Sequence, residues 1–369
     1  MNYLFLTEYF PESEKAEFTG GVENRVFYIS KGLSKNNDVT VICSRQKGQK
    51  KYSKVGKVKV VRPGPINVYS QRGNILSRLF FAVSAYFEGS KHKSDFVEGC
   101  SFITYIPAFF VGKRLKAKKV ATWHETWVGE WIKNKGLITG IFGEVWERIS
   151  IKQGWDEIVC VSDFTKQRLI KKGVKCKRII VVPNGIDLNK IRDIKVKKFE
   201  KPTICVVGRL TKQKNVDSII RGVALIKKEL PNVQLKVVGT GSEYESLKDL
   251  VKELDLGNNV EFLGFLPKHS DVIKTLKASH LYVSASELEG FGITVLEAMA
   301  SKLPCLLSRI QAFEEVTQKK AEFFDSQEEF AKKAINLLKN RKRYINQINR
   351  QDNIVKEYDW GRIIKKWLS

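Results

Sequence analysis

Two glutamates on either side of a glycine-rich turn are the residues of this sequence best suited to chemistry. The segment reads Glu289-Gly-Phe-Gly-Ile-Thr-Val-Leu-Glu297, and the helix-forming residues Ala298-Met299-Ala300 follow it. Amides at a helix N-terminus favour an anion, and glycine lets the backbone approach that anion closely. A diphosphate therefore fits between the two carboxylates, with one carboxylate facing a sugar ring and the other a ribose. This pattern suits a nucleotide-diphosphate sugar.

A second group of residues offers positive charge to a departing diphosphate. Gly208 and Arg209 directly follow the apolar run 203–207, and Lys214 comes five residues after Arg209. When a sugar leaves a diphosphate, negative charge grows on the phosphate oxygens, and fixed cations stabilise that charge. We therefore interpret Arg209 and Lys214 as phosphate-binding groups. The alternative is a solvated loop in a basic chain.

The first half of the chain carries two further candidate positions. Gly20 and Gly21 follow the first strand-like run, where a glycine pair lets a helix N-terminus approach a phosphate and an acceptor. His124 follows the apolar run 120–123, so we expect it at the carboxyl end of a strand. The alternatives are an ordinary strand-to-helix turn for the glycines and a structural role for the histidine.

Strand-length apolar runs alternate with helix-like stretches along the chain. The predicted strands are 3–6, 39–43, 58–61, 96–97, 120–123, 158–161 and 179–182, followed by 203–207, 234–238, 260–263, 281–284 and 304–307. The predicted helices include 22–33, 165–172, 216–229, 243–254 and 360–368. This alternation indicates an α/β protein with parallel sheets covered on both faces and ligand sites at the carboxyl ends of the strands.

The length of 369 residues suits two domains of ordinary size. Pro183-Asn184-Gly185 interrupts the alternation, and the lysine-rich segment 190–202 predicts a hinge. No apolar segment reaches the roughly 18 residues that a transmembrane helix needs, and the N-terminus reads as a buried first strand rather than a leader. We therefore expect a cytoplasmic protein, with the six cysteines reduced.

The formal net charge of +25 is concentrated in one block. Between Asp38 and Glu88 the sequence has no acidic residue, and its bases are Arg45, Lys47, Lys50, Lys51, Lys54, Lys57, Lys59, Arg62, Arg72 and Arg78. Such a block attracts a polyanion, which predicts contact of residues 39–93 with an anionic membrane. The apolar stretch 75–87 fits either a helix lying in the headgroup region or a core-facing helix. A generally lysine-rich proteome would explain the charge without any partner.

Several motifs occur in the order found in glycosyltransferase family 4, and the chain resembles that family over nearly its whole length. In the second half they are Val206-Val207-Gly208-Arg209-Leu210 with Lys214, Val237-Val238-Gly239-Thr240-Gly241, Val260-Glu261-Phe262-Leu263-Gly264-Phe265 and the 289–297 segment. In the first half they are Gly20-Gly21-Val22-Glu23, Trp123-His124-Glu125, Val161-Ser162-Asp163-Phe164-Thr165 and Pro183-Asn184-Gly185-Ile186-Asp187.

The resemblance implies a GT-B fold, with two doubly wound Rossmann-like domains facing across a cleft. Residues 1–190 would form the acceptor-binding domain, residues 191–354 the donor-binding domain, and the tail 355–369 would pack back on the first domain or simply cap the chain. The implied activity is retaining transfer of a hexose from a UDP- or GDP-sugar to an acceptor hydroxyl. The acceptor would be a lipid-linked or membrane-associated glycan or a lipid, and the enzyme would be cytoplasmic or peripheral to the membrane.

The resemblance also implies roles for individual residues. Glu289 would contact hydroxyls of the transferred hexose, and Glu297 would bind the ribose hydroxyls. His124 would hydrogen-bond the sugar or help to activate the acceptor, although the family often has Asp where this chain has Glu125. His124, Glu289, Arg209 and Lys214 form the implied catalytic set. The implied donor site also includes Gly20, Gly21, Gly208, Phe262, Leu263, Gly290, Phe291, Gly292, Ile293, Thr294 and Glu297.

Neither a cofactor nor a metal ion is expected, because the sequence has no Asp-x-Asp motif. The main alternative function is a basic nucleic-acid-binding protein of doubly wound fold, which the charge suggests. The chain lacks the interleaved aromatic and basic residues of a recognisable nucleic-acid module, so we do not expect nucleic acid as a partner. An NAD-dependent enzyme is disfavoured because no Gly-x-Gly-x-x-Gly follows the first strand.

Overall fold

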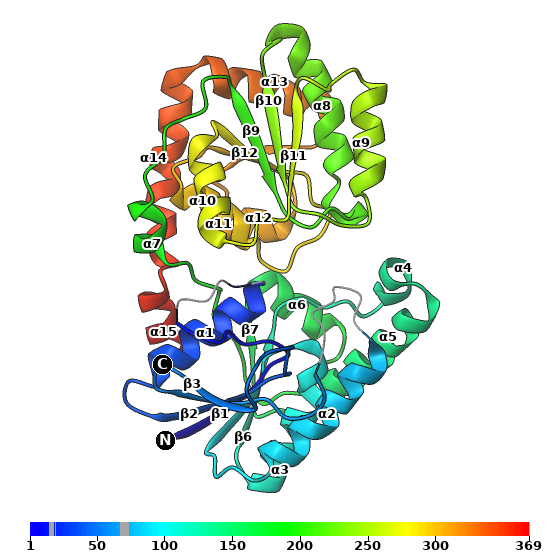
Figure 1. Cartoon of the computed structure of the whole chain (residues 1–369), viewed down its shortest axis with the longest axis vertical. Helices are drawn as coiled ribbons and strands as arrows, with labels where there is room; N and C mark the ends of the chain where they lie inside the picture. Colours follow the sequence, from blue (N-terminus) through cyan, green and yellow to red (C-terminus); the bar gives the residue numbers. More distant parts are fainter. Residues whose placement is uncertain (15–17, 19, 67–73, 369) are drawn as a thin grey trace. The chain divides into compact units, whose positions relative to one another are not determined.

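The structure is a computed structural model that describes residues 1–14, 18, 20–66 and 74–368. The chain forms two compact units, each with its own sheet (Figure 1). The first unit contains Met1–Asn184 and Ile363–Ser369, and the second contains Gly185–Arg362. The base Arg72, which belongs to the predicted basic block, lies outside the described residues.

The first unit contains an eight-stranded sheet in the order β3-β4-β2-β1-β5-β6-β7-β8. Its strands are β1 (Asn2–Leu6), β2 (Asp38–Ile42), β3 (Tyr52–Val55), β4 (Val58–Val61), β5 (Phe96–Gly99), β6 (Lys118–Trp123), β7 (Glu157–Cys160) and β8 (Ile179–Val181). Its helices are α1 (Gly21–Leu33), α2 (Ile75–Gly89), α3 (Tyr105–Leu115), α4 (Trp131–Lys135), α5 (Leu137–Lys152) and α6 (Asp163–Lys171), with a 3₁₀ turn η1 (Phe102–Thr104). All neighbouring strands are parallel except β3 and β4.

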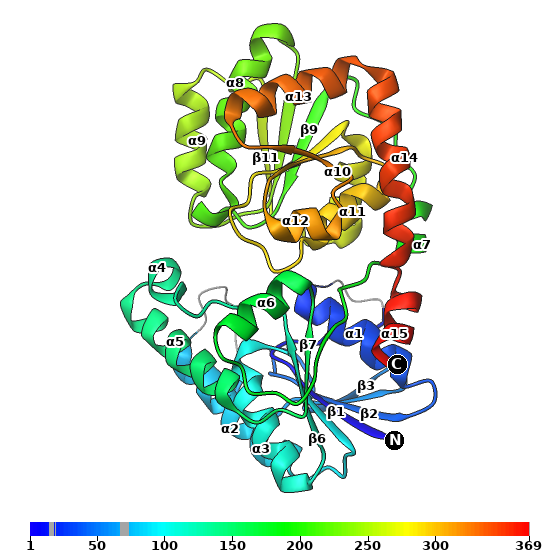
Figure 2. The ribbon, with the colours of Figure 1, turned by 180° about the vertical axis from the view of Figure 1, so that it is seen from behind.

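Alternate side chains of β1 face opposite layers of the first unit, as the period of a strand requires. Leu4 and Leu6 belong to one core cluster with residues of α2 and α3, such as Phe81. Tyr3 and Phe5 lie on the other face, where their rings contact Trp367 of α15 (Trp360–Leu368) at 5.8 and 6.3 Å. The sheet is therefore covered on both faces, and Figure 2 shows the helices from behind.

The second unit contains a six-stranded parallel sheet in the order β11-β10-β9-β12-β13-β14. Its strands are β9 (Thr203–Val207), β10 (Gln234–Val238), β11 (Val260–Gly264), β12 (Leu281–Ser284), β13 (Cys305–Ser308) and β14 (Glu322–Phe324). Its helices are α7 (Leu188–Asp193), α8 (Val216–Glu229), α9 (Tyr244–Glu253), α10 (His269–Ala278), α11 (Ile293–Ala300), α12 (Gln311–Val316), α13 (Gln327–Lys339) and α14 (Arg341–Glu357), with a 3₁₀ turn η2 (Lys212–Lys214).

Helix α8 shows how the sequence builds the second core. Ile219, Ile220, Val223 and Ile226 recur at helical spacing and are fully buried against β9 and β10. Gly222 lies where α8 approaches α13 closely, because a Cβ there would be 2.2 Å from Phe330 Cδ1. The two sheets with helices on their faces confirm the predicted α/β class and its two doubly wound domains.

The second unit extends beyond the predicted range 191–354 at both ends. The Ile186 amide donates to the Tyr358 carbonyl at 2.8 Å, and the Trp360 amide donates to the Ile186 carbonyl at 3.1 Å. Gly185 lies directly under the Trp360 ring, since a Cβ at Gly185 would be 2.6 Å from it. These contacts place the start of the linker and the first part of the predicted 355–369 tail in the second unit, while the end of α15 packs in the first.

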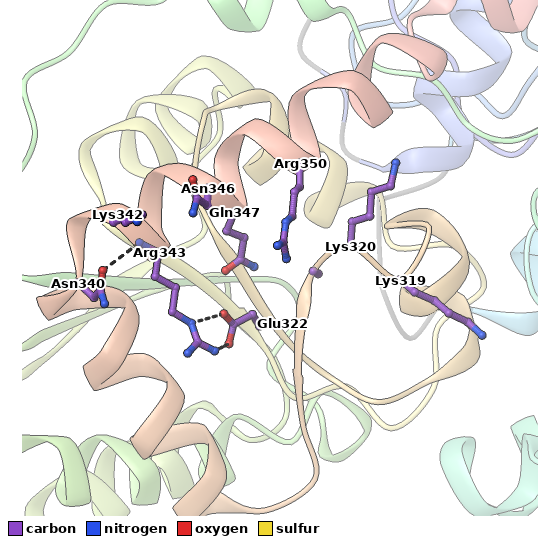
Figure 3. A pocket seen from close by; sticks show the side chains of 10 residues that line it. Lys319, Lys320, Glu322, Asn340, Lys342, Arg343, Asn346, Gln347 and Arg350 are labelled. Carbon is purple, nitrogen blue, oxygen red and sulfur yellow. Dashed lines mark hydrogen bonds and ion pairs between the residues drawn. The ribbon is translucent and has the colours of Figure 1, made fainter.

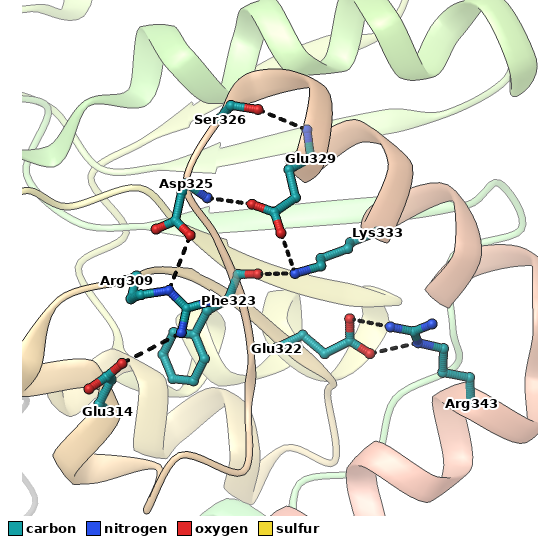
Figure 4. Close-up of polar contacts among 9 residues, drawn as sticks. All are labelled: Arg309, Glu314, Glu322, Phe323, Asp325, Ser326, Glu329, Lys333 and Arg343. Carbon is teal, nitrogen blue, oxygen red and sulfur yellow. Dashed lines mark hydrogen bonds and ion pairs between the residues drawn. The ribbon is translucent and has the colours of Figure 1, made fainter.

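Two short edge strands, β3 and β14, were not predicted from the sequence. Strand β3 pairs antiparallel with β4 through a tight hairpin, in which Gly56 has a φ of +59°. Strand β14 has only three residues, and charged side chains hold it in place (Figure 4). Glu322 accepts two hydrogen bonds from Arg343, and the Phe323 carbonyl accepts one from Lys333 at 2.6 Å. Strand β14 has no strong local signal because these partners lie 10 and 21 residues away, and the four residues of β3 form too short a run to be predicted.

Candidate active site

Lys214 and Glu289 form an ion pair in the second unit, although 75 residues separate them. Lys214 ends the η2 turn after β9, and Glu289 lies in the loop between β12 and α11. Since β9 and β12 are neighbours in the sheet, their carboxyl-end loops meet. The Ser286 hydroxyl also donates to Glu289 Oε1 at 3.0 Å. The side chain predicted to bind the phosphates, Lys214, thus lies beside the side chain predicted to bind the hexose, Glu289.

Backbone hydrogen bonds connect the loops that follow β9, β10 and β11. The Gly208 amide donates to the Val238 carbonyl at 3.0 Å, and the Gly239 amide donates to the Gly264 carbonyl at 2.8 Å. Gly239 has a φ of +130°, and a Cβ there would lie 1.9 Å from the Gly208 carbonyl oxygen. Glycine at 239 is therefore required for this approach, which holds the glycine loops together at the carboxyl edge of the sheet.

The glycine turn leads directly into helix α11. Gly292 is the N-cap residue, with a φ of +96° that favours glycine, and Ile293 begins the helix. The Thr294 hydroxyl accepts a hydrogen bond from Tyr282 at 2.9 Å. Phe291 is buried, and its ring packs on Tyr358 at 5.8 Å. The Phe291 side chain therefore anchors the turn, and Gly290 is likewise buried.

Glu297 lies one turn inside α11 and is nearly buried, with 8% of its side chain exposed. His269, the first residue of α10, places its Nε2 2.7 Å from Glu297 Oε1. His269 was not predicted from the sequence as a site residue. The spacing between these two residues follows no local period, and only the packing of α10 against α11 brings them together.

The remaining predicted residues of the second unit have different environments. Arg209 is exposed, and within the described part of the chain no hydrogen bond or ion pair is given for its side chain. The Phe262 ring packs on Tyr244 at 5.5 Å and against the core, so its side chain has a structural role. Leu263 is half-buried beside it, and the following Phe265 is 58% exposed.

In the first unit, His124 follows β6 as predicted. Burial, and secondarily the positive charge of Arg25, lowers the pKa of His124 to about 3. Its Nε2 is buried and, within the described part of the chain, has no hydrogen-bond partner. Arg25 itself is fully buried and donates to the Pro183 carbonyl at 2.8 Å. A neutral imidazole can exchange a hydrogen bond with a hydroxyl, but it brings no positive charge to the site.

The low pKa of His124 predicts a pH-dependent contribution to stability. Between about pH 6.5 and pH 3 the unfolded chain binds a proton at this residue that the folded chain excludes. The contribution is therefore complete above pH 6.5 and is lost as the pH falls. Denaturant unfolding of the wild type and of His124→Gln from pH 7 to pH 4 should show a steeper loss of stability for the wild type. Equal slopes would contradict this assignment.

Gly20 and Gly21 lie at the start of α1, where Gly20 is the N-cap residue in an extended conformation. Both glycines are exposed, and a Cβ at either would meet nothing within 4 Å. The packing of the protein therefore does not require glycine at these positions. Close approach of a ligand to the backbone remains a reason for the pair.

A cavity of about 660 Å³ lies elsewhere on the second unit and is strongly basic (Figure 3). Its charged lining residues are Lys319, Lys320, Glu322, Lys342, Arg343 and Arg350. Lys320 precedes β14, so the cavity lies at the amino end of that strand, whereas Glu289 follows the carboxyl end of β12. The cavity is thus separate from the candidate active site.

Among the described residues, no group of three or more His, Cys, Asp or Glu side chains is arranged to hold a metal ion.

Comparison with protein families gives two adjoining matches. The model "Glycosyltransferase Family 4" matches residues 19–190, and the model "Glycosyl transferases group 1" matches residues 187–353. An uncharacterized glycosyltransferase of Haemophilus influenzae is 30% identical over 217 residues, which span 58% of this chain and 60% of that protein. The GPI3 subunit of phosphatidylinositol N-acetylglucosaminyltransferase from Saccharomyces cerevisiae is 26% identical over 225 residues, spanning 57% of this chain and 49% of that protein. Each match covers less than two thirds of the relative.

Solved structures resemble the whole chain. Sucrose-phosphate synthase of Thermosynechococcus elongatus has a TM-score of 0.82 at 15% identity, with 99% of this chain and 97% of that chain covered. Anabaena HepE in complex with UDP and glucose has a TM-score of 0.76 at 17% identity, with 100% and 98% covered.

The two parallel sheets, each covered by helices, form the GT-B fold that these solved structures share. This chain belongs to the family 4 glycosyltransferases. The resemblance inferred from the motifs is confirmed, and the comparisons do not favour the nucleic-acid-binding alternative.

Proposed function

We propose that this enzyme transfers a hexose from a UDP- or GDP-sugar to an acceptor hydroxyl, with retention of configuration. The observation that carries the proposal is the ion pair of Lys214 and Glu289 beside the N-terminus of α11. It would bring a cation for the phosphates and a carboxylate for the sugar hydroxyls close to the N-terminal amides of α11, which would bind the diphosphate. Glu297, on the same helix, would hold the ribose.

Two relatives support this choice of substrates. Anabaena HepE, which shares the fold, has been solved with UDP and glucose. The yeast relative is named as part of a phosphatidylinositol N-acetylglucosaminyltransferase, and that name specifies a lipid acceptor. We therefore propose a UDP-sugar as the first donor to test, and a lipid or a lipid-linked glycan as the acceptor.

The chemistry that we propose needs no enzyme nucleophile. The acceptor oxygen forms a bond to the anomeric carbon while the bond from that carbon to the phosphate oxygen breaks. The acceptor proton passes to the departing phosphate, which leaves from the face that the acceptor approaches. Arg209, Lys214 and the α11 amides would stabilise the charge on the diphosphate, and the neutral His124 would hydrogen-bond a sugar hydroxyl.

A donor screen tests the proposed function directly. Thermal shift and slow hydrolysis would be measured with UDP- and GDP-sugars that carry different hexoses. One nucleotide sugar should raise the melting temperature and be hydrolysed, because ligand that binds only the folded state stabilises it. A panel in which no nucleotide or nucleotide sugar binds would refute the proposed donor.

We also propose that the reaction needs neither a metal ion nor a cofactor. The diphosphate would be held by Arg209, Lys214 and backbone amides, so transfer or donor hydrolysis should continue at an unchanged rate in excess EDTA. The assay would be repeated with added magnesium and manganese as controls. Loss of activity in EDTA with recovery on adding either cation would show that the leaving group needs a metal.

A further inference from the structure

Helix α2 exposes an apolar stripe although its other face is buried. Phe81, Ala82 and Ala85 pack in the core of the first unit. A second row of four apolar side chains lies on one face of the helix, at successive spacings of four, three and four residues. Each of these side chains is more than half exposed. The members of this row are Leu76, Phe80, Val83 and Phe87. The helix is therefore both a core helix and an apolar surface, which the sequence analysis treated as alternatives.

Helices α4 and α5 carry a second exposed apolar row. On α5 its members are Leu137, Ile138, Ile141, Val145 and Ile149, and Ile132 adds to it from α4. Ile138 is 80% exposed. Among the described residues, ten of the nineteen exposed large hydrophobic side chains lie on α2, α4 and α5. Single exposed apolar residues are normal, but this concentration marks an interaction surface.

The two rows belong to one layer of the first unit. Helix α3 packs against both α2 and α5, and Figure 1 shows the three helices together. Phe142 and Trp146 of α5 pack against the same core cluster as Phe81 of α2. The Phe102 ring lies 6.3 Å from Phe142 and 6.4 Å from Trp146, which ties α5 to this cluster. We call the exposed residues of α2, α4 and α5 the helical apolar surface.

The exposed charged side chains of the helices in this layer are all basic. On α2, α3, α4 and α5 the exposed charged side chains are Lys113, Arg114, Lys133, Lys135, Arg148 and Lys152. The acids of these helices are buried or half-buried: Glu88 pairs with Lys91, Glu144 pairs with Arg148, and Glu147 accepts hydrogen bonds from tryptophan indoles. An apolar stripe with a basic rim complements an anionic bilayer, whose headgroups attract Lys and Arg.

We propose that the helical apolar surface docks onto an anionic membrane. Helices of 15 and 16 residues, about 22 to 24 Å long at 1.5 Å per residue, would lie in the headgroup region with the apolar row facing the acyl chains. No helix within the described ranges is long and apolar enough to cross a bilayer. The proposal rests on the proposed function in one respect: membrane docking would give the enzyme access to a lipid-linked acceptor.

A second copy of the chain is a poorer occupant of this surface. A two-fold dimer places the same patch of both copies in contact, so the basic rim of one copy would face the basic rim of the other. Like charges in an interface oppose association. A bilayer of anionic lipids instead neutralises the rim and covers the apolar rows together.

The basic block predicted from the sequence is a weaker docking surface. Arg62 is buried and donates to Ser53 at 2.6 Å, and Arg78 pairs with Glu8 at 2.7 Å. Arg45 donates to the Gly64 carbonyl. The remaining lysines of the block lie around the β3–β4 hairpin at the edge of the sheet, where Tyr52 and Ile66 are the exposed large apolar residues. At this edge, membrane binding would depend on the attraction between lysines and anionic headgroups, with little apolar surface to add to it.

Co-sedimentation of the full chain with vesicles tests the proposal. Vesicles of phosphatidylglycerol and phosphatidylcholine would be compared with vesicles of phosphatidylcholine alone, at low and high salt. The wild type should bind the anionic vesicles far more tightly. The variant Phe80→Gln/Phe87→Gln and the variant Ile138→Gln/Val145→Gln should each bind on the order of 10- to 100-fold more weakly, since each buried apolar side chain contributes about tenfold.

Matched variants separate this surface from general stickiness and charge. The control Ile170→Gln/Ile345→Gln removes exposed apolar residues from α6 and α14 and should bind as the wild type does. Replacing Lys113, Lys133 and Lys152 with Gln should weaken binding, whereas replacing Lys228, Lys332 and Lys342 should not. The apolar variants should bind nucleotide as the wild type does when no vesicles are present, which would show that they are folded. This measurement also separates failure of the membrane proposal from failure of the proposed nucleotide-sugar donor.

Three results would overturn the proposal. The first is equal binding of the wild type and both apolar variants. The second is loss of vesicle binding only when Lys50, Lys51, Lys54, Lys57 and Lys59 become Gln, which would move the contact to the sheet edge. The third is a wild-type dimer in sedimentation that the apolar variants convert to a monomer, with no vesicle binding by either form.

Discussion

Lys214→Ala is expected to lower turnover by on the order of 100-fold or more. The ammonium group opposes negative charge that grows as the diphosphate departs, and removing one such electrostatic contact typically costs about two to three orders of magnitude in turnover. The loss should appear in kcat more than in KM, because the charge is larger in the transition state than in the bound donor. Steady-state transfer or donor hydrolysis with the donor from the screen would measure it. Arg209→Ala should lower turnover in the same direction.

Lys212→Ala is the matched control for Lys214→Ala. Lys212 lies on the same η2 turn, is exposed and carries the same charge, but it does not pair with Glu289. It should keep the turnover of the wild type. The melting temperature of Lys214→Ala should change little, because ion pairs near the surface contribute about 0 to 1 kcal/mol. Wild-type turnover in a normally folded Lys214→Ala protein would make this lysine merely a surface cation.

The ion pair also explains why the lysine and the glutamate have to be studied together. Without Lys214, the Glu289 carboxylate keeps its Ser286 hydrogen bond but loses its countercharge. It would then repel the donor phosphates that Lys214 attracts. The affinity of Lys214→Ala for the nucleotide diphosphate, which carries no hexose, should therefore recover in part when Glu289 is also changed to Gln.

Periodicity and glycine placement were enough to predict most of the fold. Helix α8 was predicted with the bounds that the structure has, because its apolar residues recur at helical spacing and a polar turn precedes it. Strands β9, β10 and β12 were also predicted with their observed bounds. These strands are continuous apolar runs because both faces of a parallel sheet are covered.

Features that depend on tertiary contacts could not be predicted in this way. Edge strand β14 is held by partners on α13 and α14, and the contact of His269 with Glu297 needs two distant elements to meet. The exposed row on α5 reads in the sequence like an ordinary amphipathic core helix, because the pattern gives the apolar face but not what covers it. Only the exposure of these side chains in the folded structure distinguishes the two.

Glu297→Gln is expected to weaken nucleotide affinity by about 1.5 to 3 kcal/mol, or roughly 10- to 150-fold, because hydrogen bonds to a charged group have about this strength. The carboxylate would bind two ribose hydroxyls, and the glutamine amide offers only one acceptor oxygen. The substitution keeps the size of the buried side chain and leaves His269 a polar partner. Titration calorimetry with the nucleotide diphosphate of the donor would measure the change.

The ribose assignment can be tested further by removing a hydroxyl from the ligand. The wild type should bind the 2′-deoxynucleotide more weakly than the ribonucleotide, whereas Glu297→Gln should discriminate much less between the two. These four affinities form a thermodynamic cycle of one protein change and one ligand change. The cycle isolates the contact between Glu297 and the ribose from general effects of the substitution. Thr275→Ser, on helix α10, is the control and should discriminate as the wild type does, because its hydroxyl can still donate to the Asp271 carbonyl. Unchanged affinity in Glu297→Gln, or equal discrimination by both proteins, would place the ribose elsewhere.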